Sequence, residues 1–215
     1  MNINIKNIER FQYITHDSEK YSHSELAIKA INAGCKWVQI RIKNKNKDFI
    51  KEEILKVKKH LTPDHKVKII INDYVDLAFE TNADGVHLGK KDIHPDEARK
   101  ILGSNAIIGA TANSYEDIEY ISNFEIDYIG LGPFRFTTTK EKLDKILGLE
   151  GYIEIMKKTK NANINIPIIA IGGIRFDDIQ SIIDTGVYGV AVSGYVTFNN
   201  DFENAVKQFL QFFKN

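Results

Sequence analysis

The stretch Tyr128-Ile129-Gly130-Leu131-Gly132-Pro133-Phe134-Arg135-Phe136-Thr137-Thr138-Thr139-Lys140 contains the local pattern on which the fold of this chain depends. Its first residues are apolar and predict a short buried strand, which the glycines and Pro133 bring to an end. The loop that follows carries three consecutive hydroxyls and a lysine, and these groups bind phosphate oxygens well. A solvated surface turn is the alternative, because Thr and Lys are also common in turns.

Similar short apolar runs recur along the chain at intervals of roughly 20–30 residues, as repeated strand–helix units require. They predict eight strands, at Phe11–Thr15, Trp37–Arg41, Val67–Ile71, Gly85–Leu88, Ala106–Ala110, Tyr128–Leu131, Ile166–Ala170 and Tyr188–Val192. Amphipathic segments with helix start signals lie between them, for example the capping-box pattern Ser22-His23-Ser24-Glu25.

Eight strands that alternate with helices predict a parallel sheet closed into a single (β/α)8 TIM barrel, with residues 1–215 forming one domain. An open, doubly wound sheet is the alternative. No Gly-x-Gly-x-x-Gly motif opens the first predicted helix, which disfavours a dinucleotide-binding fold.

The composition argues against nucleic acids and membranes as partners. Lys plus Arg and Asp plus Glu both total 29, so the formal net charge is zero and a broad nucleic-acid surface is not expected. No apolar run reaches the length of about 18 residues that a membrane span needs, and the segment Met1 to Arg10 lacks the apolar stretch of a signal peptide. The single cysteine, Cys35, fits a reducing compartment, so we expect a cytoplasmic protein without membrane or nucleic-acid partners.

In a barrel of this kind the functional groups lie at the carboxyl ends of the strands. The second predicted strand ends in Gln39, Arg41 and Lys43, which alternation places on one face. Long polar side chains on a buried strand need a partner or a ligand, and a guanidinium together with an ammonium suits a polyphosphate. A charged strand end that merges into the lysine-rich segment 43–47 is the alternative.

Two carboxylates follow the third and fourth predicted strands. Asn72 and Asp73 come directly after an apolar run, and Asp92 follows Gly85–Leu88. As a lone feature Asp73 would be a helix N-cap, but two carboxylates on adjacent strand ends beside a basic cluster predict a Mg²⁺–diphosphate site. His87 is interpreted as a packed strand histidine, because no second histidine lies at ligand spacing.

The remaining strand ends offer hydroxyls and glycines. Thr111 directly follows the fifth predicted strand, where it could bind a ligand. Gly172 and Gly173 follow the seventh strand, and Val192 and Ser193 end the eighth, at the position where many barrels bind phosphate. A Gly-Gly pair alone also makes an ordinary turn.

Taken in order, these segments resemble the thiamine phosphate synthase family, also called thiamine-phosphate pyrophosphorylase. The resemblance covers nearly the whole chain and includes Ala83-Asp84-Gly85-Val86-His87-Leu88-Gly89 and Ile171-Gly172-Gly173-Ile174. It implies an enzyme, a transferase of thiamine biosynthesis, that joins a hydroxymethylpyrimidine diphosphate to a thiazole phosphate and releases diphosphate. Its partners are then small molecules. A homodimer is expected, because proteins of this fold family often dimerise.

The resemblance also implies roles for individual residues. Asp73 and Asp92 would bind Mg²⁺, and Arg41, Lys43 and Lys140 would act in catalysis. The substrates would contact the residues at the strand ends and in the opening loop, namely Gln39, Arg41, Lys43, Asn72, Thr111, Thr137, Thr139, Lys140, Gly172, Gly173, Val192 and Ser193. The implied mechanism is dissociative, so that diphosphate leaves before the thiazole nitrogen attacks the pyrimidine-methyl cation.

The chain departs from the family pattern at four positions. Tyr74 replaces a frequent arginine, Lys90 a glutamine and Asn113 a histidine, and Arg135 adds charge to a loop that is usually apolar or aromatic. Arg135 or Lys90 is expected to compensate for the change at Tyr74. The alternatives to a synthase are a thiazole tautomerase, a catalytically silent phosphate binder, and a sugar-phosphate isomerase or aldolase on the same fold.

Overall fold

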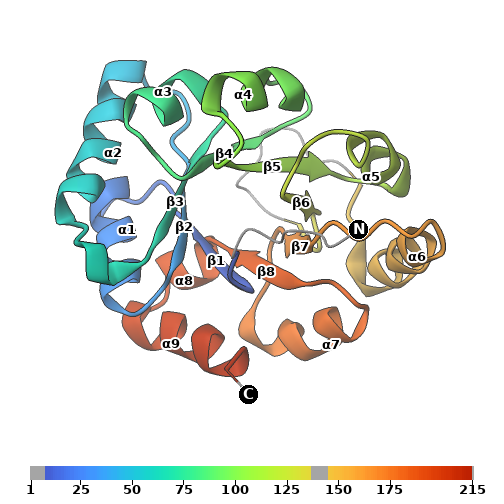
Figure 1. Ribbon diagram of the computed structural model, residues 1–215. Coiled ribbons are helices and arrows are strands. Elements are labelled where there is room, and N and C mark those ends of the chain that lie inside the picture. The colour runs from blue at the N-terminus through green and yellow to red at the C-terminus, as the bar shows by residue number, and fades with distance from the viewer. Residues whose placement is uncertain (1–7, 137–144, 215) are drawn as a thin grey trace.

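The computed structural model describes residues 8–136 and 145–214. Eight parallel strands pair in chain order and close into a barrel, and Figure 1 shows the helices as a ring around it. The strands are β1 (Phe11–Ile14), β2 (Trp37–Ile40), β3 (Lys68–Asn72), β4 (Gly85–Leu88), β5 (Ile107–Ala112), β6 (Tyr128–Leu131), β7 (Ile168–Ile171) and β8 (Gly189–Val192). The predicted (β/α)8 barrel is confirmed, with strand ends that differ from the prediction by at most two residues.

The helices that cover the barrel are α1 (His23–Asn32), α2 (Lys47–His60), α3 (Val75–Glu80), α4 (Pro95–Leu102), α5 (Tyr115–Ile121), α6 (Gly148–Asn161), α7 (Ile179–Asp184), α8 (Gly194–Thr197) and α9 (Phe202–Phe212). Ser22 and Glu25 form the predicted capping box of α1. The short α8 was not predicted, since four residues give no periodic apolar pattern. No helix within the described ranges is long and apolar enough to cross a membrane.

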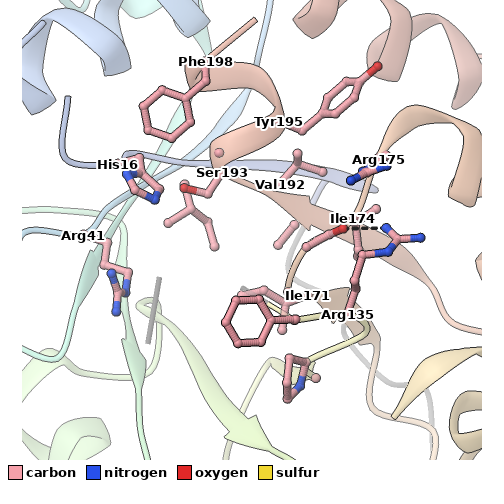
Figure 2. Close-up of a pocket in the computed structure, with 18 residues that line it drawn as sticks. His16, Arg41, Arg135, Ile171, Ile174, Arg175, Val192, Ser193, Tyr195 and Phe198 are labelled. Atoms are coloured by element: carbon pink, nitrogen blue, oxygen red, sulfur yellow. Dashed lines mark hydrogen bonds between the residues drawn. The ribbon is translucent and has the colours of Figure 1, made fainter. Parts of the chain in front are cut away.

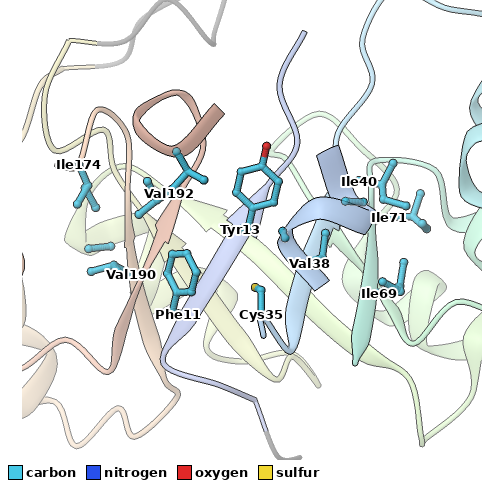
Figure 3. Packing of buried hydrophobic residues seen from close by; sticks show 14 of the residues in the cluster. Phe11, Tyr13, Cys35, Val38, Ile40, Ile69, Ile71, Ile174, Val190 and Val192 are labelled. Carbon is cyan, nitrogen blue, oxygen red and sulfur yellow. The ribbon is translucent and has the colours of Figure 1, made fainter. Parts of the chain in front are cut away.

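Side-chain alternation along the strands divides the core into two layers. Phe11 and Tyr13 on β1, like Val38 and Ile40 on β2, point outward and pack against the helices (Figure 3). The residues between them point into the barrel, where Ile14, Trp37 and Ile70 belong to a separate apolar cluster. The strands are therefore buried on both faces, which explains why they read as continuous apolar runs.

A chain of polar side chains also crosses the barrel interior. The Tyr128 hydroxyl lies 3.0 Å from His87 Nδ1, and His87 Nε2 lies 3.0 Å from Thr111 Oγ1. On the other side, Gln12 Nε2 donates to the Tyr128 hydroxyl at 3.5 Å and Gln39 Nε2 donates to Gln12 Oε1 at 3.3 Å. His87 is thus the packed strand histidine that the sequence indicated. Burial raises the pKa of Tyr128, so its hydroxyl stays protonated and can donate.

Two glycines leave the space that these hydrogen-bonded side chains occupy. A Cβ at Gly109 would come within 2.1 Å of Tyr128 Cζ, and one at Gly130 would come within 2.9 Å of His87 Cε1. The rings of His87 and Tyr128 stack with centroids 5.4 Å apart in the space left free. The hydrogen bonds in the barrel interior therefore depend on glycines on two neighbouring strands, β5 and β6.

Replacement of Tyr128 by phenylalanine is expected to lower the free energy of unfolding by about 1–3 kcal/mol, because the buried Gln12 and His87 lose a shared hydrogen-bond partner. Urea unfolding followed by circular dichroism measures this change. An unfolding midpoint equal to that of the wild type would show that the hydroxyl contributes nothing to stability.

Candidate functional site

A cavity of about 340 Å³ opens at the carboxyl ends of the barrel strands (Figure 2). Its lining comes from the ends of β1, β2, β6, β7 and β8 and from the loops after them, and includes Ile14, His16, Arg41, Gly132, Arg135, Gly172, Gly173, Arg175, Ser193 and Tyr195. Figure 2 shows Arg41 and His16 on one side and Arg135 and Arg175 on the other. Two sides of the cavity therefore carry cationic groups.

The turn after β7 has a backbone that only glycine adopts easily. Gly172 and Gly173 have φ angles of 98° and 67°. A Cβ at Gly172 would lie 2.7 Å from Pro133, and one at Gly173 would lie 2.9 Å from the carbonyl oxygen of Phe136. The predicted Gly-Gly turn thus packs directly against the loop after β6.

The end of β8 contributes a buried hydroxyl. Ser193 Oγ is buried, lines the cavity and has no hydrogen-bond partner among the described residues. A buried hydroxyl without a partner is costly, so a ligand atom is the natural acceptor or donor for it. Val192 points the other way and packs in the layer between strands and helices, so only its backbone can meet a ligand.

The two predicted carboxylates meet beside this cavity. Asp73 follows β3, Asp92 follows β4, and both line a cleft of about 390 Å³ together with Tyr74. Asp73 is not an N-cap: Tyr74 occupies the cap position of α3 without a side-chain hydrogen bond, and Asp73 itself has a φ of 66°. Its carboxylate instead pairs with Lys43 Nζ, the last residue of the predicted basic face.

The carboxylate pair has the chemistry of a cation site. Partial burial and the neighbouring Asp73 raise the pKa of the Asp92 carboxyl to about 6, although the backbone N–H of Gly89 donates to it at 2.6 Å. Such repulsion is relieved when a cation binds between the carboxylates. Residues 8–136 and 145–214 hold no group of three His, Cys, Asp or Glu ligands. Mg²⁺ needs only one or two carboxylates when water and substrate phosphate complete its shell, so the donor set fits.

The other predicted site residues lie deeper or outside the described ranges. Gln39 and Thr111 belong to the row of hydrogen-bonded side chains in the barrel interior, and Thr111 also lines a separate cleft with Gly89 and Asp92. Asn72 is the buried last residue of β3, next to Asp73. Thr137, Thr139 and Lys140 fall outside the residues that the structure describes.

The expected compensation for Tyr74 is not supported by the contacts of the two cations. Lys90 Nζ pairs with Asp117, and Arg135 makes a two-point ion pair with Asp178 at 2.7 and 2.9 Å. Asn113 Nδ2 donates to the carbonyl of Gly132. Lys90, Arg135 and Asn113 thus have ion-paired or hydrogen-bonded partners within the protein, and the Tyr74 ring centroid lies 5.7 Å from Lys47 Nζ.

The end of β1 carries functional groups that the sequence analysis missed. Thr15 Oγ1 accepts the backbone N–H of Arg41 at 3.0 Å and lies 2.8 Å from His23 Nδ1, whose Nε2 lies 3.1 Å from Asp17. The order hydroxyl, imidazole, carboxylate resembles a nucleophile set, but Thr15 is fully buried, so it holds Arg41 and does not attack a substrate. The available signal was a run of polar residues directly after the first apolar strand.

Comparisons with known proteins agree with this geometry. Residues 11–196 match the family described as thiamine monophosphate synthase. A thiamine-phosphate synthase of Phocaeicola vulgatus is 47% identical over 185 residues, which cover 86% of this chain and 88% of the relative. A thiamine-phosphate synthase of Flavobacterium johnsoniae is 45% identical over 201 residues and 93% of each chain.

The solved structures lead to the same family. The thiamine phosphate pyrophosphorylase from Pyrococcus furiosus is similar over 98% of both chains, with a TM-score of 0.84 and 30% sequence identity. The match of the family profile and the identity to its members both extend over most of the barrel. This chain therefore belongs to the thiamine monophosphate synthase family.

Proposed function

We propose that the chain condenses hydroxymethylpyrimidine diphosphate with thiazole phosphate to give thiamine phosphate and diphosphate. The observation that carries the proposal is that two groups of residues suited to phosphorylated ligands lie at the carboxyl ends of the strands. One combines the candidate cation site at Asp73 and Asp92 with Lys43, and the other combines the turn at Gly172 and Gly173 with Ser193. Two phosphorylated substrates need two such regions.

The residues at the end of β2 are assigned to the diphosphate. Gln39, Arg41 and Lys43 occupy alternate positions in the sequence, and the buried Thr15 hydroxyl accepts the backbone N–H of Arg41. Asp73 and Asp92 would hold Mg²⁺, which when bound supplies positive charge to the departing diphosphate. With the leaving group stabilised in this way, the thiazole nitrogen needs correct placement more than it needs a general base.

The thiazole phosphate is assigned to the cavity between β6, β7 and β8. Ser193 would donate its hydroxyl, and the backbone of Gly173 and Val192 would donate amides. Thr111, held by His87, is assigned to the pyrimidine substrate together with Asn72. Thr137 and Thr139 stay predictions of phosphate contacts from the sequence, as do a cytoplasmic location and a homodimer.

Lys140 is assigned to catalysis, because a cation in the loop after β6 would neutralise charge that develops on phosphate oxygens. Its replacement by alanine is expected to lower turnover by about 100-fold or more, the usual cost of removing one electrostatic donor from a transition state. Steady-state kinetics with both substrates measure this loss. Unchanged kinetics would remove the loop from the mechanism.

The tautomerase is the nearest alternative, and Asn113 argues against it. An amide is not a general base, and the Asn113 side chain already donates to the carbonyl of Gly132. Incubation of the purified chain with both substrates, followed by chromatography of the products, separates the alternatives. Thiamine phosphate supports the synthase. An isomerised thiazole without coupling would indicate the tautomerase, and unchanged substrates would indicate a silent binder.

A further inference from the structure

Two loops at the cavity are fastened to each other by a row of hydrogen bonds. The backbone N–H of Phe134 donates to the carbonyl of Ile171 at 2.9 Å, and that of Arg135 donates to the carbonyl of Gly172 at 2.9 Å. The Arg135 side chain continues the row, since its Nη1 donates to the carbonyl of Gly173 at 2.7 Å (dashed line in Figure 2). The loop after β6 thus holds three successive carbonyls, that of the last residue of β7 and the first two of the turn after it.

Asp178 holds the same turn from its other end. Its carboxylate accepts both Nη atoms of Arg135, at 2.7 and 2.9 Å, and the backbone N–H of Arg175 at 2.8 Å. The Asp178 side chain is only 15% exposed, so this pair is partly shielded from water. The Arg135 guanidinium lowers the pKa of Asp178, so the carboxylate is charged at neutral pH. Arg135 and Asp178 together fix both ends of Gly173–Arg175.

The pair determines where the free amides of the turn point. A peptide unit is planar and trans, so when the carbonyl of Gly173 faces Arg135 the N–H of Ile174 must face away from it. Neither that N–H nor the N–H of Gly173 has an acceptor among the described residues, and both residues line the cavity with Ser193. Successive free amides beside a free hydroxyl form a concave anion site.

We propose that Arg135 and Asp178 are a positioning pair that shapes this turn for the phosphate of the thiazole substrate. The identity of the ligand rests on the proposed function, whereas the role of the pair does not. The charge of Arg135 is already neutralised by Asp178, so Arg135 acts through the turn and is not itself the phosphate ligand. An arginine is required, because a single ammonium cannot offer a planar fork to the carboxylate and also bind the carbonyl of Gly173.

The first test compares Arg135→Lys, Arg135→Met and Asp178→Asn with a control, Glu203→Gln. The control breaks the 2.7 Å ion pair between Glu203 and Lys207 on α9, away from the cavity. We expect the variants of the pair to raise the KM for thiazole phosphate about 10-fold or more, as the loss of a charged hydrogen bond implies, with little change in the KM for pyrimidine diphosphate. The Glu203→Gln variant should have the same KM as the wild type for both substrates.

The second test does not require turnover. Calorimetric titration of each full-length variant with inorganic phosphate and with thiazole phosphate measures binding directly, and thermal unfolding confirms that each variant is folded. Loss of phosphate binding in folded Arg135→Lys or Asp178→Asn supports the proposal even if the wild type proves inactive as a synthase. Equal phosphate affinity in wild type and variants, or no phosphate binding to the wild type, overturns it. Asp178→Asn conserves shape, so at least one variant is expected to fold.

Discussion

Replacement of Asp92 by asparagine is expected to lower Mg²⁺-dependent turnover by about 1,000-fold, because a metal that neutralises phosphate oxygens supplies several kcal/mol to the transition state. Asp92 and Asp73 line one cleft and would hold the ion, whereas the third carboxylate of that cleft, Asp76, pairs with Lys47. Product formation over a range of Mg²⁺ concentrations measures the effect. The control is Asp96→Asn, which removes an exposed carboxylate from the first turn of α4. Full activity of Asp92→Asn would refute the metal assignment.

Asp92→Asn should lower activity but raise the free energy of unfolding in the absence of metal. The raised pKa of Asp92, about 6, means that its carboxyl favours the folded state below its ordinary pKa and loses that contribution as pH rises through 6. Asp73 and Lys43 are the charged groups that face it. In EDTA at pH 7.5, Asp92→Asn should therefore be more stable than the wild type by on the order of 1 kcal/mol, a value reduced for partial solvent exposure.

Urea unfolding at pH 4 and at pH 7.5 tests this prediction, since the difference between the two proteins should be small at the lower pH. Added Mg²⁺ should stabilise the wild type and leave Asp92→Asn unaffected. A variant that is less stable than the wild type at both pH values would show that Asp92 has a structural role and does not repel Asp73.

Replacement of Arg41 by methionine is expected to reduce kcat by about 100- to 1,000-fold, because it removes a preorganised cation from the leaving group. Arg41 lines the cavity of about 340 Å³ that also contains Ser193, and Thr15 accepts its backbone N–H. Steady-state kinetics with varied pyrimidine diphosphate measure the loss. Arg41→Lys is the matched variant: it keeps the charge without the planar fork, so its loss should be smaller. Equal kinetics for Arg41→Met and the wild type would exclude Arg41 from catalysis.

The barrel could be predicted because each strand is marked by a pattern in its own local sequence. Each is a short apolar run that is buried on both faces, and the predicted capping box at Ser22 begins α1. The structure places β5 two residues further, to Ala112, because Thr111 and Ala112 still pair with β6 although Thr111 is polar. A strand ends where its hydrogen bonds to the neighbouring strand end, and the sequence of a single strand does not show where that is.

The candidate site was only partly predictable. Barrel topology placed Asp73 beside Asp92, and both line one cleft. The common face expected for Gln39, Arg41 and Lys43 does not extend along the strand, because β2 ends at Ile40, Gln39 bonds to Gln12 inside the barrel and Lys43 pairs with Asp73. The orientation of Val192 away from the cavity follows from strand alternation, which places it with Val190 in the outer layer of the core. Contacts between distant segments had no local signal: Arg135 and Asp178 lie 43 residues apart and meet only because β6 and β7 are neighbours.

The reaction itself provides the most direct test of the account. The measurement is the amount of diphosphate and of thiamine phosphate formed from pyrimidine diphosphate and thiazole phosphate, with Mg²⁺ and again with EDTA. We predict equal amounts of both products, and none when either substrate or the metal is left out. Diphosphate release without thiamine phosphate, full activity in EDTA, or no reaction from the folded protein would contradict the proposed Mg²⁺-assisted condensation.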